Sequence, residues 1–147
     1  MLIDNKTYLV MSVLRCEKYC KQKHDKPSII ISISSKYESK EHNVFISDQN
    51  NVKAILRLSF ADIEKEDDAN ECMSIKDGKK VADFINKWFD LVDTIIVHCE
   101  GGISRSAGVM AAILRVKTGD DYKIFKNHKK APNMTCYLHT LKGFKYI

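Results

Sequence analysis

The sequence lacks several features that would place it in a special class of protein. It has only two prolines in 147 residues, and no stretch of it is a low-complexity linker or an internal repeat. With 44% hydrophobic and 29% charged residues, it carries enough apolar side chains to form a packed core. A disordered chain is therefore excluded, and we expect one globular domain spanning residues 1–147.

Long hydrophobic runs are also missing. The longest apolar stretches, such as residues 95–97 and 107–114, are far shorter than the roughly 20 residues that a membrane-spanning helix needs. The N-terminal residues show no basic leader followed by an apolar segment, as a secretory signal would. We expect a soluble, cytoplasmic protein without a membrane partner.

Neither the cysteines nor the charge indicates a special ligand. The five cysteines are an odd number without a CxxC pair, which fits neither a disulfide framework nor a zinc site. The histidines lack the spacing of metal ligands. The excess of 24 Lys and Arg over 19 Asp and Glu gives a net charge of +5, which favours anionic ligands but is too dispersed to indicate nucleic acid. We therefore expect reduced thiols, no metal and no nucleic-acid partner.

Hydrophobic patterning predicts alternating strands and helices. We expect strands at residues 7–14, 29–33, 52–60 and 94–98, with a short additional strand at 43–46. Helices are expected at 15–23, after Ser74, at 104–119, after Asp120 and after Asn133. The strand at 94–98 is almost wholly apolar, so we place it at the centre of the sheet, with the strand at 52–60 beside it. The expected fold class is an α/β domain with a central sheet flanked by helices.

One loop, between the central strand and the helix at 104–119, concentrates the residues that can do chemistry. It reads His98-Cys99-Glu100-Gly101-Gly102-Ile103-Ser104-Arg105-Ser106. Gly101 and Gly102 let the backbone curl so that the N–H groups of residues 100–105 point inward, and the N-terminus of the helix adds positive charge. Arg105 supplies a planar fork for two phosphate oxygens. The loop is therefore predicted to bind a phosphate group.

Cys99 lies at the centre of this positive field, which favours a thiolate over a thiol. A thiolate in line with phosphorus can form a phosphocysteine intermediate, while the amides and Arg105 hold the phosphoryl oxygens. Ser106 can donate a hydrogen bond to the sulfur and ease its departure. His98 either orients the loop or fills a buried polar site.

The leaving oxygen needs a proton, so we expect a carboxylic acid on a neighbouring loop. Asp62 is the best candidate, because it follows the strand at 52–60 and the carboxyl ends of parallel strands meet at one edge. Its rivals in the same acidic segment are Glu64, Glu66, Asp67 and Asp68.

These residues resemble a known family. The motif His98-Cys99-x-x-Gly102-x-x-Arg105-Ser106 is similar to the signature of the cysteine-dependent protein tyrosine and dual-specificity phosphatases. Phe60-x-Asp62-Ile63 resembles the general-acid segment of compact microbial members. The last helix opens on Ala131-Pro132-Asn133, which resembles the Pro-Asn stretch of dual-specificity enzymes.

The resemblance implies the cysteine-phosphatase fold with a mostly parallel sheet, and hydrolysis of phosphorylated proteins or peptides without a cofactor. It also implies that Cys99 is the nucleophile, Arg105 the phosphate binder, Asp62 the acid and Asn133 a supporting residue. The sequence departs from the larger tyrosine-specific enzymes in having no Trp-Pro-Asp acid loop, which favours a shallow, less selective pocket. Residues 100–104 contain no Lys or Arg, unlike the loops of phosphoinositide phosphatases of this group, and this disfavours a lipid substrate.

Two other functions use the same residues. A catalytically weak module would bind a phosphorylated ligand without useful turnover. An arsenate reductase would need a resolving cysteine, for which Cys72 and Cys136 are candidates. The sequence leaves the physiological substrate and the oligomeric state open.

Overall fold

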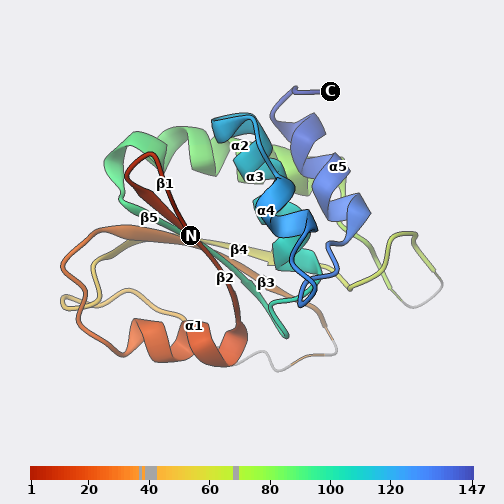
Figure 1. Cartoon of the computed structure of the whole chain (residues 1–147). Helices are drawn as coiled ribbons and strands as arrows, with labels where there is room; N and C mark the ends of the chain where they lie inside the picture. Colours follow the sequence, from red (N-terminus) through yellow and green to blue (C-terminus); the bar gives the residue numbers. More distant parts are fainter. Residues whose placement is uncertain (37, 39–42, 68–69) are drawn as a thin grey trace.

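The computed structural model in Figure 1 describes residues 1–36, 38, 43–67 and 70–147. Within these residues, one sheet has the strand order β1-β2-β5-β3-β4. The strands are β1 (Leu2–Ile3), β2 (Lys6–Ser12), β3 (Ser28–Ser34), β4 (Val52–Ser59) and β5 (Thr94–Cys99). Only the short β1 is antiparallel to its neighbour, so the sheet is mostly parallel, as expected.

Two of the inner strands, β3 and β5, are rich in β-branched residues and buried on both faces, as strands within a parallel sheet usually are. Every residue of β5 is buried, and β5 is the middle strand, as expected. The expected pairing of β4 with β5 is wrong, because β3 lies between them. Hydrophobicity alone does not separate these positions, since β3 and β5 are both mostly apolar and buried. The carboxyl ends of β3, β4 and β5 nevertheless meet at one edge.

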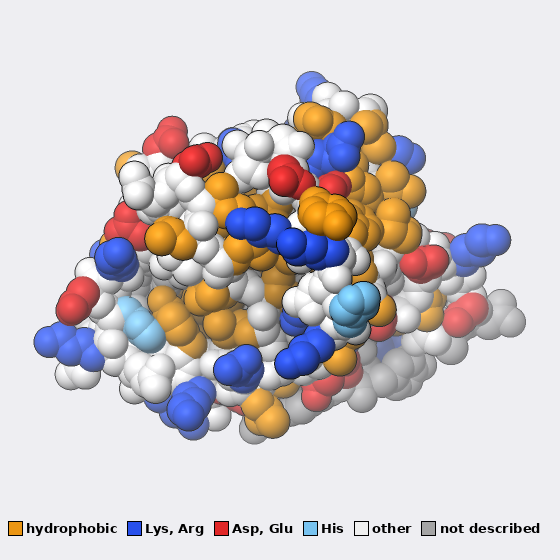
Figure 2. Space-filling model, viewed as in Figure 1, with side chains coloured by type: hydrophobic (Ala, Val, Ile, Leu, Met, Phe, Trp, Pro, Cys, Tyr) orange, Lys and Arg blue, Asp and Glu red, His pale blue; other side chains and the backbone are white. Residues whose placement is uncertain are grey.

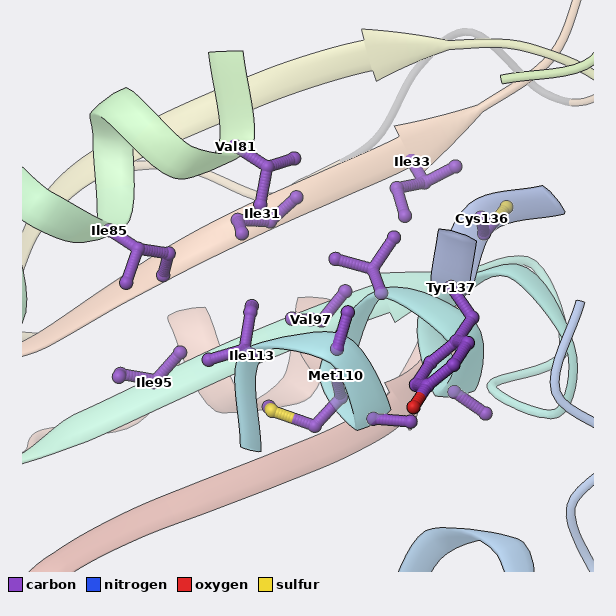
Figure 3. Packing of buried hydrophobic residues seen from close by; sticks show 14 of the residues in the cluster. Ile31, Ile33, Val81, Ile85, Ile95, Val97, Met110, Ile113, Cys136 and Tyr137 are labelled. Carbon is purple, nitrogen blue, oxygen red and sulfur yellow. The ribbon is translucent and has the colours of Figure 1, made fainter. Parts of the chain in front are cut away.

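Helices cover both faces of the sheet (Figure 1). One face carries α2 (Ile75–Trp88), α3 (Arg105–Thr118), α4 (Tyr122–Phe125) and α5 (Met134–Gly143), and the other carries α1 (Val13–Cys20). A one-turn helix, η1 (Phe89–Leu91), follows α2. The larger core lies beneath α2, α3 and α5, where Val81, Ile85 and Ile113 pack against Ile31 and Val97 (Figure 3). A smaller core lies beneath α1.

Local capping fixes where several helices begin. Ser74 and Asp77 form the reciprocal capping box at the start of α2 that their spacing predicted. Asn133 caps α5 by accepting a hydrogen bond from the backbone N–H of Cys136, as expected. Helix α1 begins earlier than expected, because Ser12 accepts a hydrogen bond from the backbone of Arg15 and so ends the strand.

Residues 43–47 are irregular, so the strand expected at 43–46 is wrong. Val44 is buried in the core beneath α1, and its carbonyl accepts a hydrogen bond from the side chain of Arg57. The Val44 carbonyl is thus bonded by a side chain, where a strand residue would be bonded by the backbone of a neighbouring strand. Within the described ranges, no helix has the length and apolar character needed to cross a membrane.

Candidate active site

The candidate catalytic loop, residues 100–104, connects the end of the middle strand β5 to the start of α3. Two segments distant in sequence hold it by backbone hydrogen bonds. Val13 donates to the carbonyl of Glu100 at 3.2 Å, and Ala131 donates to that of Ile103 at 3.0 Å. The loop is therefore fixed between the start of α1 and the segment that precedes α5.

Gly102 is the glycine that this loop requires. It has a φ of +69°, and a Cβ atom there would lie 2.5 Å from the carbonyl carbon of Met11. Gly101 does not have a positive φ, and its nearest neighbour would be the side chain of Ile103 at 3.8 Å. Of the two glycines that were expected to let the backbone curl, only Gly102 therefore has a conformation and a close contact that require glycine.

Cys99 and Ser106 lie side by side beneath the loop. The Cys99 Sγ atom is 3.1 Å from the Ser106 Oγ atom, and both residues are buried. They flank the N-terminus of α3, whose unpaired N–H groups place partial positive charge near the sulfur. This geometry can stabilise negative charge on sulfur and on a bound phosphate.

Arg105 is buried beside Cys99, and Glu38 holds one edge of its guanidinium group. Nη1 and Nη2 donate to the two carboxylate oxygens of Glu38 at 2.9 and 2.6 Å, and Nη1 also donates to the carbonyl of Phe60 at 3.1 Å. The Nε–H group is buried and has no acceptor among the described residues. An unpaired buried donor is costly, and a phosphate oxygen held by the loop would satisfy it.

The ion pair changes the acidity of both partners. Burial lowers the pKa of Arg105, but the hydrogen bonds and charge of Glu38 outweigh burial and raise this pKa overall. Burial raises the pKa of Glu38, but Arg105 outweighs it and lowers this pKa overall. Glu38 was not predicted as a site residue, because it lies in a polar segment without a hydrophobic period or a motif.

Asp62 lies at the rim of the site, where two side chains hold its carboxylate. Its Oδ1 atom accepts hydrogen bonds from Ser104 Oγ at 2.8 Å and Asn133 Nδ2 at 3.0 Å. A cavity of about 390 Å³ is lined by Glu38, Asp62, Cys99, Glu100, Gly101, Ile103, Ser104 and Arg105. The predicted acid, nucleophile and arginine thus share one cavity.

Of the rival acids in the same segment, the three that the structure describes, Glu64, Glu66 and Asp67, do not line this cavity. Glu64 accepts a hydrogen bond from the backbone of Met134 at the start of α5, and Asp67 accepts one from Asn70. Glu66 is exposed to solvent. Asp68 lies outside the described residues. Of the candidate acids that the structure describes, Asp62 is the one placed beside Cys99.

His98 and Asn133 support the loop from the interior. His98 is fully buried, and its Nε2 atom is 2.6 Å from Ser32 Oγ. Asn133 donates from Nδ2 to Asp62 and to the carbonyl of Ile63, while its backbone N–H donates to the carbonyl of Ser104. Asn133 therefore ties the acid segment to the catalytic loop and to α5.

Lys130 also reaches the loop. Its ammonium group donates to the carbonyl of Gly102 at 2.5 Å. Burial lowers the pKa of Lys130, the nearby Arg15 lowers it too, and Cys99 raises it. In the sequence, Lys130 is only one of four neighbouring lysines, Lys123, Lys126, Lys129 and Lys130. Nothing local to it indicates a contact with a residue 28 positions away.

The described residues include no group of three or more His, Cys, Asp and Glu side chains placed to hold a metal ion. All five cysteines are free thiols. Burial raises the pKa of Cys136, which disfavours the thiolate that a resolving cysteine needs.

Comparison with known proteins identifies the fold. No protein-family model and no curated protein matches the sequence. Human DUSP28 is similar at a TM-score of 0.61 and 17% identity, over 95% of this chain and 92% of that chain. PTPMT1 in complex with PI(5)P is similar at a TM-score of 0.58 and 19% identity, over 99% of this chain and 94% of that chain.

A third similar structure is the human tyrosine phosphatase-like serine/threonine/tyrosine-interacting protein. It has a TM-score of 0.57 and 20% identity, over 79% of this chain and 75% of that chain. The chain has the fold of the cysteine-dependent tyrosine and dual-specificity phosphatases, as the signature around Cys99 predicted.

Proposed function

We propose that the chain is a cytoplasmic protein phosphatase that hydrolyses phosphotyrosine, with phosphoserine and phosphothreonine as further candidate substrates. The observation that carries this proposal is that Arg105, whose buried Nε–H group has no acceptor among the described residues, lines the same cavity as Cys99. A bound phosphoryl group would satisfy that donor and present its phosphorus to the sulfur.

The first step transfers the phosphoryl group to the enzyme. The Cys99 thiolate attacks phosphorus, a sulfur–phosphorus bond forms, and the bond from phosphorus to the leaving oxygen breaks. Asp62 donates its proton to that oxygen, while the loop amides and Arg105 bind the remaining phosphoryl oxygens. The products of this step are the dephosphorylated substrate and phosphocysteine.

The second step releases phosphate. The Asp62 carboxylate takes a proton from a water molecule, whose oxygen attacks phosphorus and breaks the sulfur–phosphorus bond. Ser106 donates its hydroxyl proton in a hydrogen bond to the departing sulfur and stabilises the thiolate. Inorganic phosphate leaves, and Asp62 is protonated again for the next cycle.

Turnover of an aryl phosphate without added metal tests the proposal. We expect the wild-type protein to release phosphate, and Cys99→Ser to lower kcat by about 10⁴-fold or more. Cys136→Ser is the matched control, because it removes a buried thiol that does not line the cavity, and it should retain turnover. Unchanged turnover in Cys99→Ser would remove Cys99 from the mechanism.

A panel of phosphopeptides and phosphoinositides then assigns the substrate. We expect phosphotyrosine peptides to be hydrolysed and phosphoinositides to be poor substrates, since residues 100–104 carry no basic side chain. Tight phosphopeptide binding without turnover by the wild-type protein would instead favour a binding module.

A further inference from the structure

A groove lies beside the candidate active site, on the face of the sheet that carries α1. It has a volume of about 400 Å³ and is lined by Leu9, Val10, Met11, Arg15, Lys18, Tyr19 and Gln22. We call it the β2–α1 groove. In Figure 2, hydrophobic side chains are visible between the two layers of helices, and Lys and Arg side chains lie along the lower edge, where Figure 1 places α1.

The groove adjoins the catalytic loop. The backbone of Met11 and Ser12, where β2 passes into α1, lies directly against Gly102. Val13, the first residue of α1, donates a hydrogen bond to the carbonyl of Glu100. A chain whose phosphorylated side chain occupies the cavity above Cys99 would therefore have one of its flanks at the entrance to the groove.

Two basic side chains of α1, Arg15 and Lys18, line one edge of the groove. Arg15 and Lys18 are three residues apart on α1 and so lie on one face of the helix, and Gln22 follows just beyond its end; all three are exposed. Neither Arg15 nor Lys18 makes an ion pair with a residue that the structure describes.

Charge is distributed unevenly around the cavity. Glu38 and Asp62 follow β3 and β4, on one side of β5, whereas Arg15 follows β2 on the other side. Lys130 reinforces the basic side through its contact with Gly102 and its proximity to Arg15. Glu100 is the acidic residue at the boundary between the two sides.

We propose that the β2–α1 groove binds the segment of a phosphopeptide substrate that flanks the phosphorylated residue, and that this segment is acidic. Carboxylates of the peptide pair with Arg15 and Lys18, and an apolar side chain packs on Leu9 and Met11. The proposal rests on the proposed phosphatase function, whose substrate class it specifies.

Peptide kinetics test the groove. Three phosphotyrosine peptides are compared: one with three glutamates before the phosphotyrosine, one with three glutamates after it, and one with alanines at these positions. We expect one acidic peptide to exceed the alanine peptide in kcat/KM by about tenfold at low salt, and the ratio to fall as ionic strength rises.

Two charge-reversed variants locate the effect. Arg15→Glu with Lys18→Glu should remove or invert the preference for the acidic peptide. Lys76→Glu with Lys80→Glu makes the same change of charge on exposed positions of α2, on the opposite face of the sheet, and should keep the preference. Thermal unfolding of each variant confirms that it is folded, and Lys18→Glu alone provides a milder variant.

Binding and turnover are measured separately so that the two proposals can fail separately. Anisotropy of the labelled peptides on Cys99→Ser reports the groove without catalysis, whereas turnover of a small aryl phosphate by the wild-type protein reports the catalytic loop. Equal affinity for acidic and alanine peptides, or an acidic preference that survives charge reversal on α1, would overturn the groove proposal. Preferential hydrolysis of phosphoinositide vesicles that depends on Arg15 and Lys18 would overturn the peptide proposal and show that the groove binds a lipid surface.

Discussion

Asp62 and Glu66 lie on the same acidic segment and both are exposed, but Asp62 lines the cavity that contains Cys99 and Glu66 does not. If Asp62 protonates the leaving oxygen, its loss should matter most for substrates whose leaving group is a poor one. We expect Asp62→Asn to lower kcat by about 100-fold or more for an alkyl or phenyl phosphate, and far less for a nitrophenyl or fluorinated aryl phosphate.

The control for this experiment is Glu66→Gln, which removes one carboxylate from the same segment and should leave kcat unchanged for every substrate. An equal loss across all leaving groups in Asp62→Asn would argue against the role of proton donor.

We infer that Glu38 is a positioning residue, because it binds one edge of the Arg105 guanidinium group, whose Nε–H group has no acceptor among the described residues. We expect Glu38→Gln to raise the inhibition constant of inorganic phosphate by about tenfold, because a guanidinium held less firmly binds phosphate less well. Glu66→Gln again serves as the matched control. A phosphate affinity that does not change in Glu38→Gln would show that Arg105 needs no such support.

The same pair predicts a pH dependence of stability. Because the folded protein lowers the pKa of Glu38 below its ordinary value of 4.5, the pair stabilises the fold above that value, and this stability is lost as pH falls through the lowered pKa. The unfolding temperature of Glu38→Gln should therefore be below that of the wild-type protein at pH 7. The difference should shrink in acid, below about pH 4. A constant difference from neutral to acidic pH would contradict the assignment.

At the scale of elements, the catalytic loop depends on its contact with the junction of β2 and α1. Gly102 combines a left-handed backbone with a close approach to Met11, whereas Gly101 has neither. We expect Gly102→Ala to lower the free energy of unfolding by about 2–3 kcal/mol. Gly101→Ala should change it by less than about 0.5 kcal/mol. Denaturant unfolding measures the change in the free energy of unfolding for each variant. Similar changes in Gly102→Ala and Gly101→Ala would contradict the loop geometry.

The elements that could be predicted from sequence are those whose signal is local. The capping box of Ser74 and Asp77 and the β-branched run of β5 depend on residues close together in the chain. The order of the strands depends on which faces pack together, so β3 was not placed between β4 and β5. The strand expected at residues 43–46 is wrong for a similar reason. The carbonyl of Val44 accepts a hydrogen bond from the distant Arg57 side chain and not from a neighbouring strand.

The residues of the candidate site also fall into two groups: those that lie within one local motif and those that the fold brings together. Cys99, Arg105 and Ser106 lie within one short motif, so their proximity follows from the loop between β5 and α3. Glu38 and Lys130 join them only because the sheet and the α4–α5 connection bring distant segments together. No periodicity or spacing in the sequence predicts the contacts of Glu38 and Lys130.

At the scale of the whole molecule, the topology distributes both charge and packing around the middle strand. The large core beneath α2, α3 and α5 holds β5 and α3 in place, and so fixes the loop between them. Acidic residues that follow β3 and β4 lie on one side of Cys99, and basic residues that follow β2 lie on the other. A substrate is therefore expected to enter with its acidic flank toward α1.

The central claim is that the Cys99 sulfur carries the phosphoryl group between substrate and water. Rapid mixing with excess aryl phosphate, acid quenching and intact-mass measurement test this claim directly. We predict a transient species that is heavier by one phosphoryl group, located on the peptide that contains Cys99 and lacking in Cys99→Ser. Phosphate release with no such species, or with the added group on another residue, would contradict the account.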